Sequence, residues 1–278
     1  MRHPISFLFP VAFLLFCTGC GLGGEPPRER LSVEFLHVGQ GNACLLRHGS
    51  HAMLLDAGPD SMGIADTLRR RGVDSLEWVL VSHGHRDHCG GLFELIGKIG
   101  IGKIWVGPDT NEQWALDSVY RAARAKGVLM DSLFRGDSLP GLEPWTSRVL
   151  WPKPGARVAD NGASLVTQIG DNSANFLYVG DLGQEQETAL MLLEPSLHTN
   201  ILQVGHHGSA TSSGLPFIGQ LSPEYAVICV GENPWGHPRA ETLARLSLII
   251  RDSSKILRTD RQGSIRFTFS SGFGFWPD

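Results

Sequence analysis

A short segment, VLVSHGHRDHCGG at residues 79–91, constrains this chain more than any other part of its sequence. It starts with apolar residues typical of a buried strand and then places four polar residues close together: His83, His85, Asp87 and His88. Imidazole nitrogens and carboxylates are the ligands that zinc and similar divalent metals prefer. Because strand side chains alternate between faces, we expect His83 and His85 to point to the same side. The turn that follows is expected to place Asp87 and His88 next to them. The segment therefore predicts a metal site at the end of a strand.

Short strands alternate with helices along the rest of the chain, and this pattern predicts the fold class. Strands are expected at 31–38, 43–47, 52–55, 78–82, 165–169, 175–179, 200–204, 225–230, 255–258 and 264–269. Helices are expected at 64–71, 112–126, 185–193 and 240–251. Two β-rich halves with helices between them predict an α/β (α+β) chain that forms an αββα sandwich, with two mixed sheets flanked by helices. We expect residues 31–278 to form a single domain.

The N-terminus has the features of an export signal. Arg2 precedes a short apolar run over 5–16, which is too short to cross a bilayer comfortably and favours a signal peptide over residues 1–20. Its end resembles the lipobox of bacterial lipoproteins, which implies that Cys20 is lipidated and anchors the protein to a membrane. Residues 21–30, rich in glycine and proline, are expected to form a flexible tether. The chain is thus predicted to be exported, as a cell-envelope lipoprotein facing the periplasm or the cell exterior, with an ordinary cleaved signal peptide as the alternative.

The metal motif, HxHxDH followed by two glycines, resembles the signature of the metallo-β-lactamase superfamily. The resemblance implies two bound divalent ions, with Zn²⁺ expected and Mn²⁺ as the alternative. The ligands that it implies are His83, His85, Asp87, His88, Asp181 in VGD and His206 in HHGS. Asp56, in DAG, matches an aspartate that orients a ligand and does not bind metal itself.

Further motifs occur in an order that resembles the extracytoplasmic metallo-β-lactamase domain of ComEC-type DNA-uptake proteins, here in a stand-alone version. They are VGQGNACLL, NGASLV, YVGD, HHGS, WGHP and RTDRQGSI, and the similarity spans residues 31–268. The transmembrane channel of those proteins is not part of the similarity, so a separate membrane DNA-transport channel is an expected partner. The interval between His88 and Asp181 contains no histidine, although the superfamily usually places one there on the first ion. Asn161 and Ser164 occupy this region, so the first ion is expected to be weakly held or completed by oxygen ligands.

Two further histidines of the C-terminal half lie near the ends of expected strands. We expect His237 to donate a proton or a hydrogen bond to developing negative charge, and His207 with Ser209 to hold a phosphate. The alternative is that His207 only supports a neighbouring ligand and that His237 is a turn residue beside Pro238.

These features together predict a metal-dependent hydrolase that acts outside the cytoplasmic membrane through a metal-activated water, with Asp87 and His237 as catalytic residues. A phosphodiesterase or nuclease is the leading prediction, so the expected substrate is a phosphodiester, DNA included. With 24 basic and 28 acidic residues, the chain is no general polyanion binder. One alternative is a hydrolase of a small-molecule or cell-wall phosphoester, or less favourably of a lactam or thioester. The other is a non-catalytic lipoprotein that binds DNA or a partner.

Overall fold

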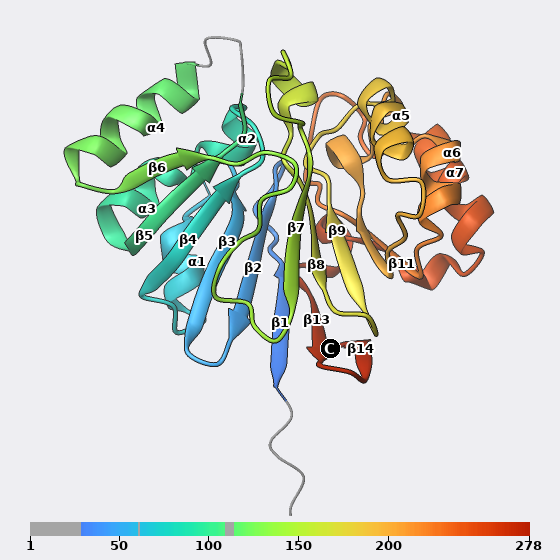
Figure 1. Cartoon of the computed structure of the whole chain (residues 1–278), viewed down its shortest axis with the longest axis horizontal. Helices are drawn as coiled ribbons and strands as arrows, with labels where there is room; N and C mark the ends of the chain where they lie inside the picture. Colours follow the sequence, from blue (N-terminus) through green and yellow to red (C-terminus); the bar gives the residue numbers. More distant parts are fainter. Residues whose placement is uncertain (1–28, 61, 109–113) are drawn as a thin grey trace, which may run out of the picture.

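Two mixed β-sheets lie face to face, with helices covering their outer faces, in a computed structural model that describes residues 29–60, 62–108 and 114–278 (Figure 1). This arrangement confirms the predicted αββα sandwich. The predicted signal peptide, the lipidation site Cys20 and nearly all of the predicted tether lie outside the described residues.

The first sheet has eight strands, antiparallel from β14 to β3 and parallel from β3 to β6. In spatial order they are β14 (Gly274–Pro277), β13 (Ile265–Ser270), β1 (Arg30–Phe35), β2 (Ala43–His48), β3 (His51–Ala57), β4 (Ser75–Val81), β5 (Gly100–Val106) and β6 (Leu129–Ser132). Pairing of β1 with β13 joins the two ends of the chain in one sheet.

The second sheet has six strands, parallel from β12 to β9 and antiparallel from β9 to β7. In spatial order they are β12 (Ile256–Arg258), β11 (Tyr225–Ile228), β10 (Ile201–Gln203), β9 (Asn175–Tyr178), β8 (Val166–Gly170) and β7 (Thr146–Trp151). Because parallel strands end at the same edge of a sheet, the loops that follow β9, β10 and β11 gather at one end of the molecule.

The helices pack on the outer faces of the sheets. Buried apolar residues of α1 (Ile64–Arg69), α3 (Leu92–Lys98) and α4 (Trp114–Ala125) form a core on the first sheet. Those of α5 (Gln184–Leu193), α6 (Leu215–Leu221) and α7 (Ala240–Ile250) do the same on the second. The short helices α2 (Arg86–Cys89) and α8 (Thr259–Gln262) and the 3-10 turns η1 (Asp160–Ala163), η2 (Gly205–Gly208) and η3 (Ser253–Lys255) lie in loops. Within the described part of the chain, no helix is both long enough and apolar enough to span a membrane.

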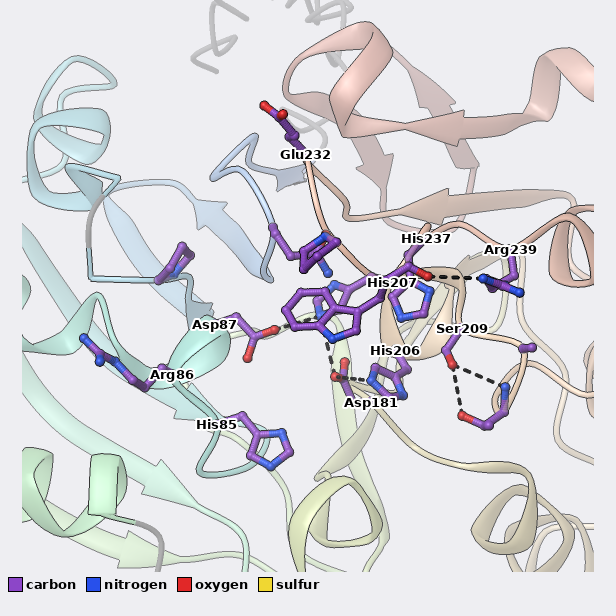
Figure 2. A pocket seen from close by; sticks show the side chains of 16 residues that line it. His85, Arg86, Asp87, Asp181, His206, His207, Ser209, Glu232, His237 and Arg239 are labelled. Atoms are coloured by element: carbon purple, nitrogen blue, oxygen red, sulfur yellow. Dashed lines mark hydrogen bonds and ion pairs between the residues drawn. The ribbon is translucent and has the colours of Figure 1, made fainter.

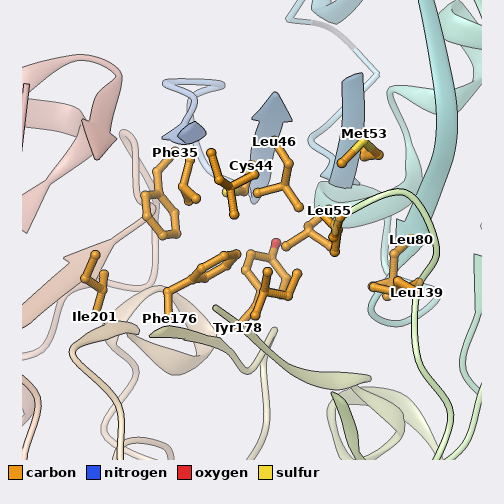
Figure 3. Close-up of a cluster of buried hydrophobic side chains, with 14 of the residues drawn as sticks. Phe35, Cys44, Leu46, Met53, Leu55, Leu80, Leu139, Phe176, Tyr178 and Ile201 are labelled. Atoms are coloured by element: carbon orange, nitrogen blue, oxygen red, sulfur yellow. The ribbon is translucent and has the colours of Figure 1, made fainter. Parts of the chain in front are cut away.

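The central core fills the space between the two sheets (Figure 3). Alternate residues of β1 and β2, such as Phe35 and Leu46, point toward the second sheet because strand side chains alternate between faces. Phe35 meets Phe176 of β9 edge to face, with ring centroids 6.3 Å apart. Fully burying side chains of this kind stabilises a fold by about 1.5–3 kcal/mol each, so this layer fixes how the sheets sit on each other. It thereby also fixes the relative position of the loops at their ends.

Candidate metal centre

The HxHxDH segment leaves the first sheet at the end of β4. Because β4 ends at Val81, His83 and His85 lie in the following loop, and the expectation that a strand aligns them is wrong. Asp87 and His88 lie in the single turn of α2. Gly91 lets this turn pack closely against the end of β3, because a Cβ there would lie 2.2 Å from the carbonyl oxygen of Ala57.

Four side chains from both sheets bring their ligating atoms within 4.8 Å of one another: Asp87, His88, Asp181 and His207. The Asp87 and His88 side chains come from α2, Asp181 follows β9 and His207 lies in η2 after β10. His88 Nε2 lies 3.2 Å from Asp181 Oδ1, and His207 Nε2 lies 3.1 Å from Asp87 Oδ2. We call these four residues the metal cluster.

The cluster contains unsatisfied polar atoms that fit a bound cation. Among the described residues, His88 Nε2 and Asp181 Oδ1 are buried and find no hydrogen-bond partner, although the two atoms face each other at 3.2 Å. Leaving such atoms without a partner costs free energy, and two facing lone pairs repel each other unless a proton or a cation lies between them. Imidazole nitrogens with carboxylate oxygens form the donor set of Zn²⁺ and related ions. The residues present therefore fit a divalent metal.

His83 and His85 face each other beside the cluster. His83 Nε2 lies 3.0 Å from His85 Nδ1 and 4.0 Å from Asp181 Oδ2. Two ring nitrogens at this separation can bind one ion together, so these histidines and Asp181 are the candidate ligands of a first ion. The outer nitrogen of His85 lies 3.8 Å from Asp160, a neighbour that the sequence analysis did not single out.

Asp56 lies behind the metal cluster and fixes the orientation of the His88 ring. Its carboxylate accepts hydrogen bonds from His88 Nδ1 at 2.7 Å, from Tyr178 Oη at 2.8 Å, and from the backbone N–H and hydroxyl of Ser82 at 2.6 and 2.7 Å. Since an ionised carboxylate can only accept, His88 Nδ1 carries a proton, and Nε2 is the ring nitrogen that faces the cluster. Ser82 and Tyr178 were not expected at this site. The signals in the sequence were a serine directly before the first histidine and a tyrosine at the end of a largely apolar strand.

The carboxylates and histidines of the metal cluster stabilise one another's charged forms. Burial would raise the pKa values of Asp87 and Asp181, but the neighbouring histidines outweigh it and hold both well below their ordinary range. Burial likewise opposes a charge on His88, yet Asp181, Asp56 and Asp87 raise its pKa well above the usual value. Both carboxylates are therefore ionised at neutral pH and can bind a cation.

The structure brings His207, not His206, into the metal cluster. Both residues have positive φ angles, 49° for His206 and 53° for His207, a conformation uncommon outside glycine that turns the two rings apart. His207 is buried, and its Nδ1 donates to the Cys229 carbonyl at 2.8 Å, which leaves Nε2 for a metal. His206 lies at the rim, with Nε2 3.8 Å from Asp181 Oδ2. His207 and Ser209 both line the pocket, and the Ser209 hydroxyl lies within hydrogen-bond distance of that of Thr211 at 3.0 Å, so their shared role in holding a phosphate stays a prediction.

Asn161 and Ser164, predicted to stand where a third histidine is usual, act on neighbouring residues. The Asn161 amide lies 3.3 Å from His206 Nδ1, and its Oδ1 has no hydrogen-bond partner in the part of the chain that the structure describes. With the amide turned over, that oxygen would accept the Nδ1 proton and leave His206 Nε2 as a lone-pair donor. Ser164 Oγ accepts the backbone N–H of Asp181 at 3.1 Å and so positions that aspartate.

An open pocket of about 940 Å³ leads to the cluster (Figure 2). His237 lines it next to His206, with ring centroids 5.6 Å apart. Burial lowers the pKa of His237, and the neighbouring histidines lower it further, so its ring is neutral at pH 7. Arg86, which pairs with Asp60, and Arg239, 3.9 Å from Glu241, line the same pocket from opposite sides, and Glu232 lines it as well.

The fold and the metal cluster together define a class of protein. The family model of the metallo-beta-lactamase superfamily matches residues 36–232, and the chain belongs to this superfamily, whose members are generally hydrolases. Within it, the chain is similar to competence proteins. ComE operon protein 3 of Bacillus subtilis (strain 168) is 29% identical across 95% of this chain, and competence protein ComA of Neisseria gonorrhoeae is 31% identical across 97%.

The chain spans 35% and 39% of the lengths of these two curated relatives, respectively. Among solved structures, the metallo-beta-lactamase fold protein YhfI from Bacillus subtilis aligns with a TM-score of 0.57 and 12% identity. The alignment covers 87% of this chain and 100% of that one, and it supports the fold assignment.

Proposed function

We propose that this chain is a metal-dependent phosphodiesterase, with DNA among its substrates, that acts outside the cytoplasmic membrane. The observation that carries the proposal is the pair of orphaned atoms, His88 Nε2 and Asp181 Oδ1, in the metal cluster at the base of an open pocket. A site with this donor set and an open approach suits hydrolysis better than a structural role, because structural metal sites are closed.

Bound divalent ions would supply Lewis acidity and a water nucleophile at neutral pH. The chain's own residues provide the rest of the site. Asp56 fixes the ring of His88, and the ionised Asp87 and Asp181 line the pocket. His237, neutral and on the pocket wall, is placed to donate a hydrogen bond to a leaving oxygen. Arg86 and Arg239, which also line the pocket, can donate hydrogen bonds to a phosphodiester.

DNA is proposed as the substrate because the motifs resemble those of DNA-uptake proteins, and two competence proteins are similar across nearly all of this chain. We further propose that the protein is exported, held on the membrane by a lipid at Cys20, and works beside a separate DNA-transport channel. A Cys20→Ala variant should then move from the membrane fraction to the soluble export fraction. Unchanged partitioning would contradict the lipid anchor.

The test of the activity uses two substrates with the purified full chain. Bis(p-nitrophenyl) phosphate and linear DNA are incubated with Zn²⁺ or Mn²⁺, beside Asp87→Ala and a control, His198→Ala, that alters a histidine outside this pocket. We expect cleavage by the wild type and by the control, and its loss in Asp87→Ala. Bound metal without cleavage of either substrate would favour another hydrolase substrate. No metal and no cleavage would favour a non-catalytic binding protein.

A further inference from the structure

The WGHP segment places a large aromatic side chain at the pocket, and neither the metal cluster nor its supporting residues account for it. Trp235 lies between β11 and α7, lines the pocket and is 58% exposed. By contrast, Trp78, Trp145 and Trp151 are buried. An indole that stays exposed on a pocket wall retains apolar area that a ligand can cover.

The loop that carries Trp235 is held in place by hydrogen bonds. The Asn233 amide donates to the carbonyls of Gly231 and His237 at 2.8 and 2.9 Å and accepts the His237 N–H at 2.9 Å. At one end of the loop, Gly231 N–H donates to Gln40 Oε1. At the other end, Arg239 donates to the Trp235 carbonyl at 3.3 Å. A platform fixed in this way loses little conformational entropy when a ligand binds.

The indole also has a defined orientation relative to the rest of the site. Its ring is nearly parallel to that of His237, with an interplanar angle of 21° and centroids 6.3 Å apart. His237 in turn neighbours His206, whose Nε2 lies 3.8 Å from Asp181. A row of rings therefore runs from the pocket wall to the metal cluster, and Arg239 lies along the same wall.

We propose that Trp235 is the platform on which an unpaired nucleobase stacks while its phosphodiester lies at the metal cluster. This inference rests on the proposed function and narrows it to single-stranded or locally unpaired nucleic acid. In a duplex each base is already stacked on its neighbours. An indole on a pocket wall can therefore stack only on an unpaired or terminal base. Stacking on an aromatic side chain tolerates any base, because every base has a π-face.

The test compares two labelled strands that carry the same phosphates. One is an oligothymidylate, and the other has an abasic tetrahydrofuran unit in place of every nucleoside. Their dissociation constants are measured by fluorescence anisotropy with the metal-loaded full chain, and a denaturing gel confirms that the strands stay intact during the measurement. The variants are Trp235→Ala, Trp235→Phe and a control, Trp276→Ala, which alters a 41% exposed tryptophan on β14, at the end of the sandwich opposite α2 (Figure 1).

We expect the wild type to bind the thymidine strand about tenfold to a hundredfold more tightly than the abasic strand, as loss of one base–aromatic stack would predict. Trp235→Ala should lose this preference, Trp235→Phe should retain most of it, and Trp276→Ala should equal the wild type. A wild type without preference, or a preference that survives in Trp235→Ala, would overturn the inference. Failure of the proposed function is seen separately, as absence of hydrolysis of bis(p-nitrophenyl) phosphate by the wild type.

Discussion

At the scale of single residues, the site depends on side chains that hold the ligands as much as on the ligands. Asp56 accepts four hydrogen bonds with no exposure to solvent, and one of them fixes the proton of His88. Ser82 donates two of these four hydrogen bonds. It therefore helps Asp56 to position His88, the last histidine of the motif. Outer partners of this kind set the basicity and the orientation of a metal ligand.

Replacing Asp56 should therefore weaken metal binding without removing a ligand. We expect Asp56→Ala to lower metal affinity about 10- to 100-fold, the range typical of such partners. Asp66→Ala, which changes an aspartate on α1, serves as the control and should bind metal like the wild type. Isothermal titration with Zn²⁺ measures both, and equal affinities would contradict the role of Asp56.

The sequence predicted the residue types of the site better than their exact positions. The density of histidine and aspartate at 83–88 marked the metal site, and the strands that end in aspartate marked Asp56 and Asp181. Adjacent histidines in HHGS could not be told apart, because which ring turns inward depends on two positive φ angles and on the Cys229 carbonyl. Tyr178 was missed because its partner Asp56 lies on the other sheet.

At the scale of elements, close backbone approaches bring α2 to the metal cluster. Gly41, in the loop between β1 and β2, has a φ of 153°, and a Cβ there would lie 2.3 Å from the carbonyl oxygen of Asp87. The next residue, Asn42, donates its N–H to that oxygen at 3.1 Å. The turn at residues 39–42 therefore fixes the position of α2 relative to the first sheet.

Gly41→Ala should displace α2 and lower the metal content, while Gly97→Ala should not. Gly97 lies in α3 with nothing within 4 Å of its Cβ position. Alanine there should raise the free energy of unfolding by about 0.5–1 kcal/mol, because glycine is the poorer helix former. Elemental analysis and urea unfolding of both variants test this, and full metal content in Gly41→Ala would contradict it.

Glu187 on α5 anchors the loop before α6 from a buried position. Its carboxylate accepts the backbone N–H groups of Ser213 and Gly214. Burial raises its pKa to about 7 from an ordinary value of 4.5, although those N–H groups and Arg245 lower it. Between pH 4.5 and about pH 7, the folded state therefore binds more protons than the unfolded chain. The stability supplied by the protonated carboxyl is lost as the pH rises through this range.

We expect the free energy of unfolding of the wild type to fall by about 3 kcal/mol relative to Glu187→Gln between pH 4.5 and pH 8. Glutamine cannot titrate, so the variant lacks this component of the pH dependence. Urea unfolding at several pH values measures the difference. Parallel curves for the two proteins would show that Glu187 stays ionised in the folded state.

The regular elements were largely predictable, and the short ones were not. The strands β1 and β13 alternate polar and apolar residues, and β2 contains a short apolar run; all three were expected within a few residues of their observed ends. The strands β5, β6, β7 and β14 and the helices α3 and α6 were not expected. β5 contains two glycines and a lysine that dilute its apolar pattern, and α6 is only seven residues long. The four-residue α2 is set by tertiary contacts, which no local pattern reveals.

At the scale of the whole molecule, the metal cluster joins the two halves of the sandwich. Asp87 and His88 belong to the first sheet's connections, and Asp181 and His207 belong to those of the second. Bound metal should therefore stabilise the entire fold. Free Zn²⁺ at a hundred times its Kd should add about 2.7 kcal/mol to the free energy of unfolding, and EDTA should remove it. Thermal unfolding tests this, and a Tm unchanged by EDTA in metal-loaded protein would contradict it.

The metal content of three purified full-length proteins tests the central claim most directly. Wild type, His207→Ala and His206→Ala are dialysed under identical conditions and analysed by inductively coupled plasma mass spectrometry. The metal cluster predicts that the wild type retains divalent metal and that His207→Ala loses an ion that His206→Ala keeps. A wild type that binds no divalent metal, or a loss confined to His206→Ala, would contradict the site described here.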